Sequence, residues 1–156
     1  MMWASAKSVR EERSKQRFAL QDFSLIRVSL VRGKAGWRIG SAESEVNYFT
    51  AAQSQVARAS ISGVIKLLRQ FVRGEVAHEA VFTDAKSALE LSGQLPDSEV
   101  VKLKDLFGFR LLYHLGYIPP LEEYGSILND IDWWKLPELG IKARQTLEKA
   151  KEVSHL

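Results

Sequence analysis

The chain has 156 residues, of which 46% are hydrophobic and 10% aromatic, and its net charge is +3 at pH 7. This length and composition are ordinary for a folded globular protein of one domain or two small ones. The absence of cysteine excludes disulfides, thiol nucleophiles and thiolate metal sites, and the histidines are too scattered to form a metal motif. No apolar run reaches the about 18 residues of a membrane span, and no secretory signal opens the chain, so we expect a cytoplasmic protein without metal or cofactor.

Charge is distributed unevenly along the sequence. Residues 1–40 contain nine lysines and arginines and three acidic residues, whereas residues 41–156 contain thirteen basic and sixteen acidic residues. A basic segment beside an acidic body indicates a polyanionic partner, because lysine and arginine gain affinity by releasing counterions from phosphates.

The first part of the chain predicts β structure, interrupted by a polar and basic insertion at residues 7–17. Apolar and polar residues alternate over residues 26–30, which predicts a strand with an apolar face made by Ile26, Val28 and Leu30. The two glycines of residues 32–36 can adopt the positive φ angles of a short hairpin turn. A return strand is expected over residues 37–41.

From residue 44 onward the apolar residues follow the period of a helix. Helices are expected over residues 44–57, 60–73, 77–91, 99–115, 121–128 and 137–153. The predicted fold class is therefore α+β, with a truncated OB-like β segment at residues 1–42 and an all-α helical domain at residues 43–156.

The hairpin of residues 29–43 combines basic and aromatic side chains, as sites for single-stranded nucleic acid do. In such sites cations follow the phosphates, and a flat ring stacks on a base for roughly 1–3 kcal/mol whatever its identity. The candidate DNA-binding residues, taken from the hairpin and from the basic insertion, are Lys7, Arg10, Arg13, Lys15, Arg17, Arg32, Lys34, Trp37 and Arg38. The alternative is that these cations are solvated turn residues and that Trp37 fills the interior of the sheet.

Arg110 and His114 lie four residues apart in an almost wholly apolar segment. An arginine in such surroundings needs a carboxylate partner, because an unpaired buried charge is costly. Candidate partners are Glu75, Glu79 and Asp84, and a structural ion pair is favoured over a functional site.

Trp133 and Trp134 form either a docking spot for a partner protein or a clamp over the helical core, and the clamp is the favoured interpretation. The sequence has no phosphate-binding loop of the GxxxxGK[ST] type and no GxSxG nucleophile elbow. An enzyme is therefore not expected.

Two long segments resemble the bacterial RecO family, the recombination mediators of the RecFOR pathway. Residues 13–43, RSKQRFALQDFSLIRVSLVRGKAGWRIGSAE, resemble the later part of that family's N-terminal OB-fold, where a basic loop leads into two strands joined by an RG turn. LLRQFVRGE and LFGFRLLYHLGYIPPL resemble its helical domain. Two departures stand out: the chain begins near the third strand of the barrel, and the zinc-binding cysteines of many RecO proteins are missing.

The resemblance implies a non-enzymatic mediator of recombinational DNA repair. Such a protein binds single- and double-stranded DNA without sequence preference, anneals complementary strands, and promotes RecA loading with RecR and single-strand-binding protein. It would be a monomer in the bacterial cytoplasm, associated with the nucleoid. The alternative is a helical protein-interaction adaptor whose remnant OB segment no longer binds DNA.

Overall fold

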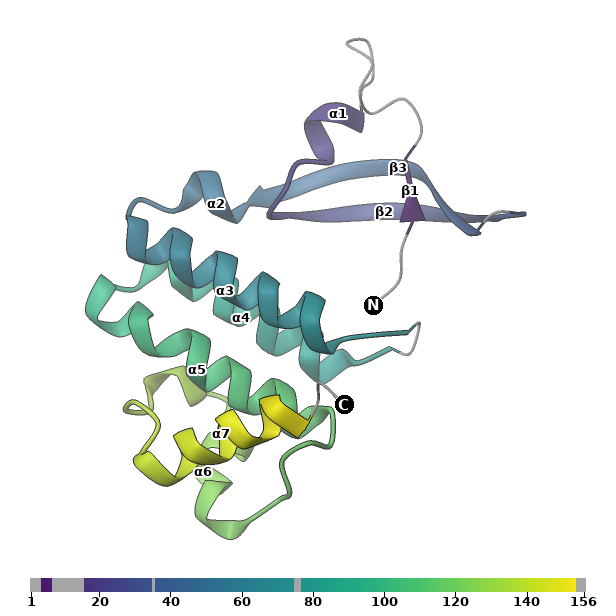
Figure 1. The fold of residues 1–156 in the computed structure, drawn as a ribbon. Coiled ribbons are helices and arrows are strands. Elements are labelled where there is room, and N and C mark those ends of the chain that lie inside the picture. The colour runs from purple at the N-terminus through teal and green to yellow at the C-terminus, as the bar shows by residue number, and fades with distance from the viewer. Residues whose placement is uncertain (1–3, 7–15, 35, 75–76, 154–156) are drawn as a thin grey trace.

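The computed structural model describes residues 4–6, 16–34, 36–74 and 77–153, and it shows a small sheet followed by a helical region (Figure 1). This arrangement confirms the predicted α+β class. The strands are β1 (Ala4–Ser5), β2 (Ser24–Gly33) and β3 (Gly36–Asn47), in the spatial order β1-β3-β2. β1 pairs with β3 in parallel and β2 pairs with β3 antiparallel. Among the described residues the sheet is open and does not close into a barrel.

The hairpin of β2 and β3 has two chemically different faces. Residues directly opposite each other on paired strands point to the same side of a sheet, and side chains alternate along each strand. One side, which we term the apolar face, carries Ile26, Val28, Leu30 and Arg32 of β2 opposite Ser44, Ala42, Ile39 and Trp37 of β3. The other side, the polar face, carries Arg27, Ser29 and Val31 opposite Glu43, Ser41 and Arg38. The apolar face predicted for β2 is therefore confirmed.

Two glycines shape the hairpin. Gly36 pairs with Gly33 at the turn and has a φ of +109°, a conformation that glycine adopts without steric cost. Gly40 lies where the pairing register shifts, and a Cβ there would come within 2.9 Å of the Ser29 hydroxyl, which itself accepts a hydrogen bond from the Ser41 amide. The shift is a β-bulge, which bends a strand and increases its twist.

The helical region contains most of the regular structure. Its helices are α2 (Tyr48–Ala51), α3 (Gln55–Phe71), α4 (Glu79–Gln94), α5 (Asp97–His114), α6 (Gly125–Asn129) and α7 (Ile141–Val153). Two 3₁₀ turns, η1 (Glu122–Tyr124) and η2 (Trp133–Lys135), lie between α5 and α7. The short helix α1 (Gln16–Ala19) lies beside the sheet. α5 is the central element, since it packs against α3, α4 and α7. Its residues Leu103, Leu106 and Phe107 are wholly inaccessible to solvent. No helix in the described part of the chain is both long and apolar enough to cross a membrane.

The helix expected over residues 44–57 is wrong. β3 continues to Asn47, because Val46 pairs with Leu25 and both pack against the helical core. The Asn47 side chain then accepts a hydrogen bond from the Thr50 amide at 2.9 Å and caps the short α2. Ser54 caps α3 in the same way, so a break separates two helices where one was predicted.

The sheet is attached to the helices at the base of the hairpin. Phe23 and Leu25 line a cavity there with Leu68 of α3 and Phe82 of α4. Phe23 has a φ of +64°, and its ring stacks on Phe49 with the centroids 4.9 Å apart. The other end of the hairpin projects away from α2 (Figure 1).

The ion pair expected for Arg110 is confirmed, with Asp84 as its partner. Arg110 Nε donates to Asp84 Oδ2 at 2.7 Å and Nη2 donates to Oδ1 at 3.0 Å. His114 Nε2 lies 3.0 Å from the same Oδ2. Burial alone would raise the pKa of Asp84, but hydrogen bonds from His114 and Arg110 and their charges outweigh it and lower that pKa below its usual value.

Trp133 is buried and clamps this cluster, as the favoured interpretation of the two tryptophans predicts. Its ring lies 5.6 Å from the guanidinium carbon of Arg110. Arg110 Nη1 also donates to the carbonyls of Ile127 and Leu128, at 2.7 and 3.0 Å. Arg110 therefore connects α4, α5 and the α6–η2 segment.

Candidate nucleic-acid interface

The predicted DNA-binding residues that the structure describes gather at the free end of the hairpin and on α1. Arg32 and Trp37 are paired across the apolar face, and the Arg32 guanidinium carbon lies 5.7 Å from the centroid of the Trp37 ring. Lys34 lies in the turn that joins the strands. The turn thus brings two cations and the aromatic ring together.

Arg38 approaches the same turn from the polar face. A Cβ built on Gly33 would lie 3.3 Å from Arg38 Cδ, so the arginine side chain extends over this glycine. Arg32 and Arg38 consequently lie on opposite faces of the sheet, where β1 pairs with β3 at Trp37 and Arg38. The sequence did not predict this division between the faces, because it depends on the pairing register.

The cations of the turn have no acidic partners within the described part of the chain. Arg32, Lys34 and Arg38 are exposed, and none of them takes part in an ion pair there. No described carboxylate therefore offsets their charges. We term these three residues the hairpin tip.

Helix α1 places one more predicted cation on the sheet. Gln16 Nε2 donates to the Gly40 carbonyl at 2.9 Å, which fixes α1 against β3 two residues from Arg38. Arg17, the next residue of α1, is exposed. The remaining predicted residues, Lys7, Arg10, Arg13 and Lys15, lie outside the described residues.

Arg27 shows the contrasting behaviour of a compensated cation. It lies on the polar face near the base of the hairpin, and its Nη2 donates to Glu45 Oε1 at 3.1 Å. This arginine was not among the predicted DNA-binding residues. The pairing makes it part of the sheet's own structure.

Trp37 is half-buried on the apolar face and does not belong to the hydrophobic core that the described residues form. The residues around it are only partly covered, since no residue of β2 or β3 is fully buried. Val28 and Leu30 are 36% and 37% exposed. Proteins that bind single-stranded nucleic acid combine aromatic rings, on which bases stack, with cations that follow the phosphates.

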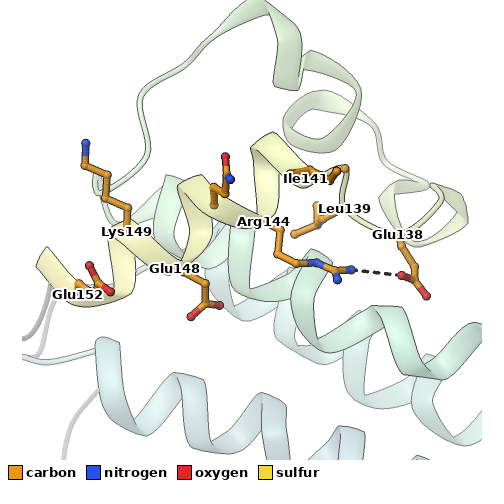
Figure 2. Close-up of a pocket in the computed structure, with 9 residues that line it drawn as sticks. Glu138, Leu139, Ile141, Arg144, Glu148, Lys149 and Glu152 are labelled. Carbon is orange, nitrogen blue, oxygen red and sulfur yellow. Dashed lines mark hydrogen bonds and ion pairs between the residues drawn. The ribbon is translucent and has the colours of Figure 1, made fainter.

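A second site that could bind a ligand lies along α7. It is an open groove with a volume of about 790 Å³. The side chains that line it include Ile141, Arg144 and Glu148 (Figure 2). Arg144 is paired with Glu138 at 3.2 Å, so the charges of this wall largely balance each other. The groove offers apolar contact from Leu139 and Ile141 among charged side chains.

The sequence interpretation missed a group of cations on and directly after α3, namely Arg58, Lys66, Arg69 and Arg73. The signal that could have revealed them is the absence of aspartate and glutamate from residues 46–74.

None of the protein-family models searched matches the chain, and no curated protein matches it with statistical significance.

Proposed function

We propose that this protein binds nucleic acid without sequence preference, with the hairpin tip as its phosphate-binding surface. The observation that carries the proposal is that Arg32, Lys34 and Arg38 gather at one turn without acidic partners among the described residues. Each cation that meets a phosphate releases counterions, whatever the base sequence. Trp37 adds an aromatic ring beside the same turn.

The two-faced arrangement of the cations is compatible with more than one form of nucleic acid. The end of a small sheet that carries cations on both faces can contact phosphates on either side. Single strands and duplexes are therefore both expected to bind, and a cationic surface also lowers the repulsion between two strands that anneal.

Together with the resemblance to RecO, this surface supports a more specific role. In that role the protein is a non-enzymatic recombination mediator that acts with RecR and single-strand-binding protein in RecA loading. A cytoplasmic location on the bacterial nucleoid follows from the same proposal.

The proposal is tested by removing the tip charges and leaving the fold intact. The triple variant Arg32→Gln, Lys34→Gln and Arg38→Gln should bind a fluorescently labelled single strand at least about tenfold more weakly at moderate salt, because three phosphate contacts are lost. Fluorescence anisotropy with two strands of unlike composition measures the affinity and its independence of sequence.

The matched control removes the same amount of charge from α7. Lys142→Gln, Arg144→Gln and Lys151→Gln together lower the net charge by the same three units, and each of these residues forms an ion pair, so this variant should bind within about twofold of the original protein. Equal binding by the hairpin variant and the unmodified protein would refute the role of the tip.

The groove on α7 favours a second candidate, a protein-interaction adaptor. Ile141, which lines the groove, is 81% exposed, so an apolar side chain of a partner protein would find a contact there. Binding of RecR or single-strand-binding protein by a chain that does not bind DNA would favour the adaptor over the mediator.

A further inference from the structure

Four exposed cations follow one line of the helical region, away from the hairpin tip. We term them the α3 stripe: Arg58, Lys66, Arg69 and Arg73. The first three lie on α3, within about 80° of arc and over about 16 Å of helix, as follows from 100° and 1.5 Å per residue. Arg73 comes two residues after the end of α3.

The rest of the helical region compensates its cations with carboxylates. Residues 48–153 contain thirteen lysines and arginines, and eight of these form ion pairs with described acidic residues. The five that do not are the four members of the α3 stripe and Lys149. A line of cations that no described carboxylate compensates is therefore a feature of α3 and not of the described helical surface in general.

We infer that the α3 stripe binds the phosphate backbone of nucleic acid, as a second contact surface beside the hairpin tip. Phosphates repeat about every 3.4 Å of axis along each strand of B-DNA, so a line of cations about 16 Å long can meet several of them. The inference shares its ligand class with the proposed function and in that sense rests on it, but none of its residues belongs to the hairpin.

The position of α3 supports a shared ligand. Figure 1 shows the hairpin and α3 both extending away from α2 toward the same side of the molecule. A strand that passes the hairpin tip can therefore continue beside the C-terminal half of α3, where Lys66, Arg69 and Arg73 lie.

A membrane surface fits the α3 stripe less well than nucleic acid does. A helix that lies on a membrane inserts an apolar face among the lipids while its cations meet the headgroups. The apolar face of α3 is occupied, since Ile61 and Val64 are wholly buried in the protein core. The residues between the cations include small or polar ones, such as the exposed Ala59 and the half-buried Ser62.

The test variant removes the charges of the α3 stripe but leaves Arg58 unchanged. Arg58 also donates a hydrogen bond to the Ala52 carbonyl and lies over the Phe49 ring, so its loss would disturb the fold. The variant is Lys66→Gln, Arg69→Gln and Arg73→Gln in the full chain. Its binding to a labelled oligothymidine of about 30 nucleotides, long enough to span both surfaces, is measured by anisotropy over a range of salt concentrations. The α7 variant with three cations neutralised is the matched control, and thermal melting verifies that each variant is folded.

If the α3 stripe contacts phosphates, the variant loses at least about tenfold in affinity at about 0.1 M salt, and its log–log salt slope becomes shallower by about 2, at 0.7 for each lost contact. The α7 control stays within about twofold of the original chain. A loss of affinity equal to that of the α7 control overturns the inference, because only net charge would then matter. No loss of affinity overturns it as well.

The hairpin variant, measured in parallel, separates this inference from the proposed function. If only the α3 variant loses binding, the α3 stripe is supported as a phosphate-binding surface and the role of the hairpin tip is refuted. If only the hairpin variant loses binding, the hairpin tip is supported and the α3 stripe is refuted. Failure of the unmodified chain to bind overturns both. Vesicles with anionic lipid are the last probe: binding to vesicles that depends on the stripe, without an effect on the oligonucleotide, would assign α3 to a membrane and contradict the inference.

Discussion

The hairpin and the helical region use the same residue types in opposite ways. Around α5, arginine and lysine are matched with carboxylates, and apolar side chains such as Leu106 and Phe107 are fully buried. On the hairpin no residue of β2 or β3 is fully buried, Val31 is 58% exposed, and the cations of the turn have no acidic partner among the described residues. The helical region therefore holds the buried core of the fold, whereas the cations of the hairpin turn are exposed.

The α3 stripe qualifies this division. Its helix is part of the stable core, yet its exposed side resembles the hairpin tip in carrying cations that no described carboxylate compensates. The distinction that matters is therefore between compensated and uncompensated charge, and it crosses the boundary between sheet and helices.

The largest effect is expected where a compensated charge is buried. Asp84→Asn removes the carboxylate that Arg110 meets with two hydrogen bonds and leaves the arginine charge buried and unpaired. The free energy of unfolding should fall by about 3–5 kcal/mol. Urea denaturation followed by circular dichroism measures this change at neutral pH.

The same variant should respond differently to acid. Because folding lowers the pKa of Asp84, its charge stabilises the native state above about pH 4, and this stabilisation is lost as the pH falls through the lowered pKa. The original chain should therefore lose more stability on acidification than the Asp84→Asn variant does.

The control for the stability change at neutral pH is Glu90→Gln on the same helix, which breaks an exposed ion pair with Lys86 and should lower the free energy of unfolding by less than about 0.5 kcal/mol. Equal costs for the two variants would contradict the structural role of Asp84.

A smaller effect of opposite sign is expected where the sheet joins the helices. The Tyr48 hydroxyl is buried and has no hydrogen-bond partner among the described residues, and burial raises the pKa of Tyr48 to about 12. Tyr48→Phe keeps the ring in place and removes the unsatisfied group, so it should raise the free energy of unfolding by about 1 kcal/mol. Thermal melting measures the change, and a clear loss of stability would show that the hydroxyl has a partner in solution.

Local patterns predicted much of this structure. The alternation of Ile26, Val28 and Leu30 identified the apolar face, and the glycines identified the turn. The apolar period of the long helices placed α3, α4 and α5 within a few residues of their ends. The carboxylate that compensates Arg110 was among the three predicted candidates.

The features that sequence reasoning missed depend on how the strands pair and on which carboxylates lie beside each cation. The end of β3 could not be predicted, because a helical pattern does not reveal that Val46 pairs with Leu25. The division of Arg32 and Arg38 between two faces follows from the register alone. The α3 stripe became visible only when the ion pairs of all other helices were known, since an exposed cation becomes a candidate site only if no carboxylate compensates it.

The central claim is that the uncompensated cations bind phosphates, and the salt dependence of single-strand binding tests it most directly. Affinity of the unmodified chain for a labelled oligothymidine should fall linearly with the logarithm of the salt concentration. Between three and seven phosphate contacts, from the hairpin tip alone or together with the α3 stripe, predict a log–log slope of about −2 to −5, at −0.7 for each contact. A slope shallower than about −0.7, or no measurable binding at low salt, would contradict the account.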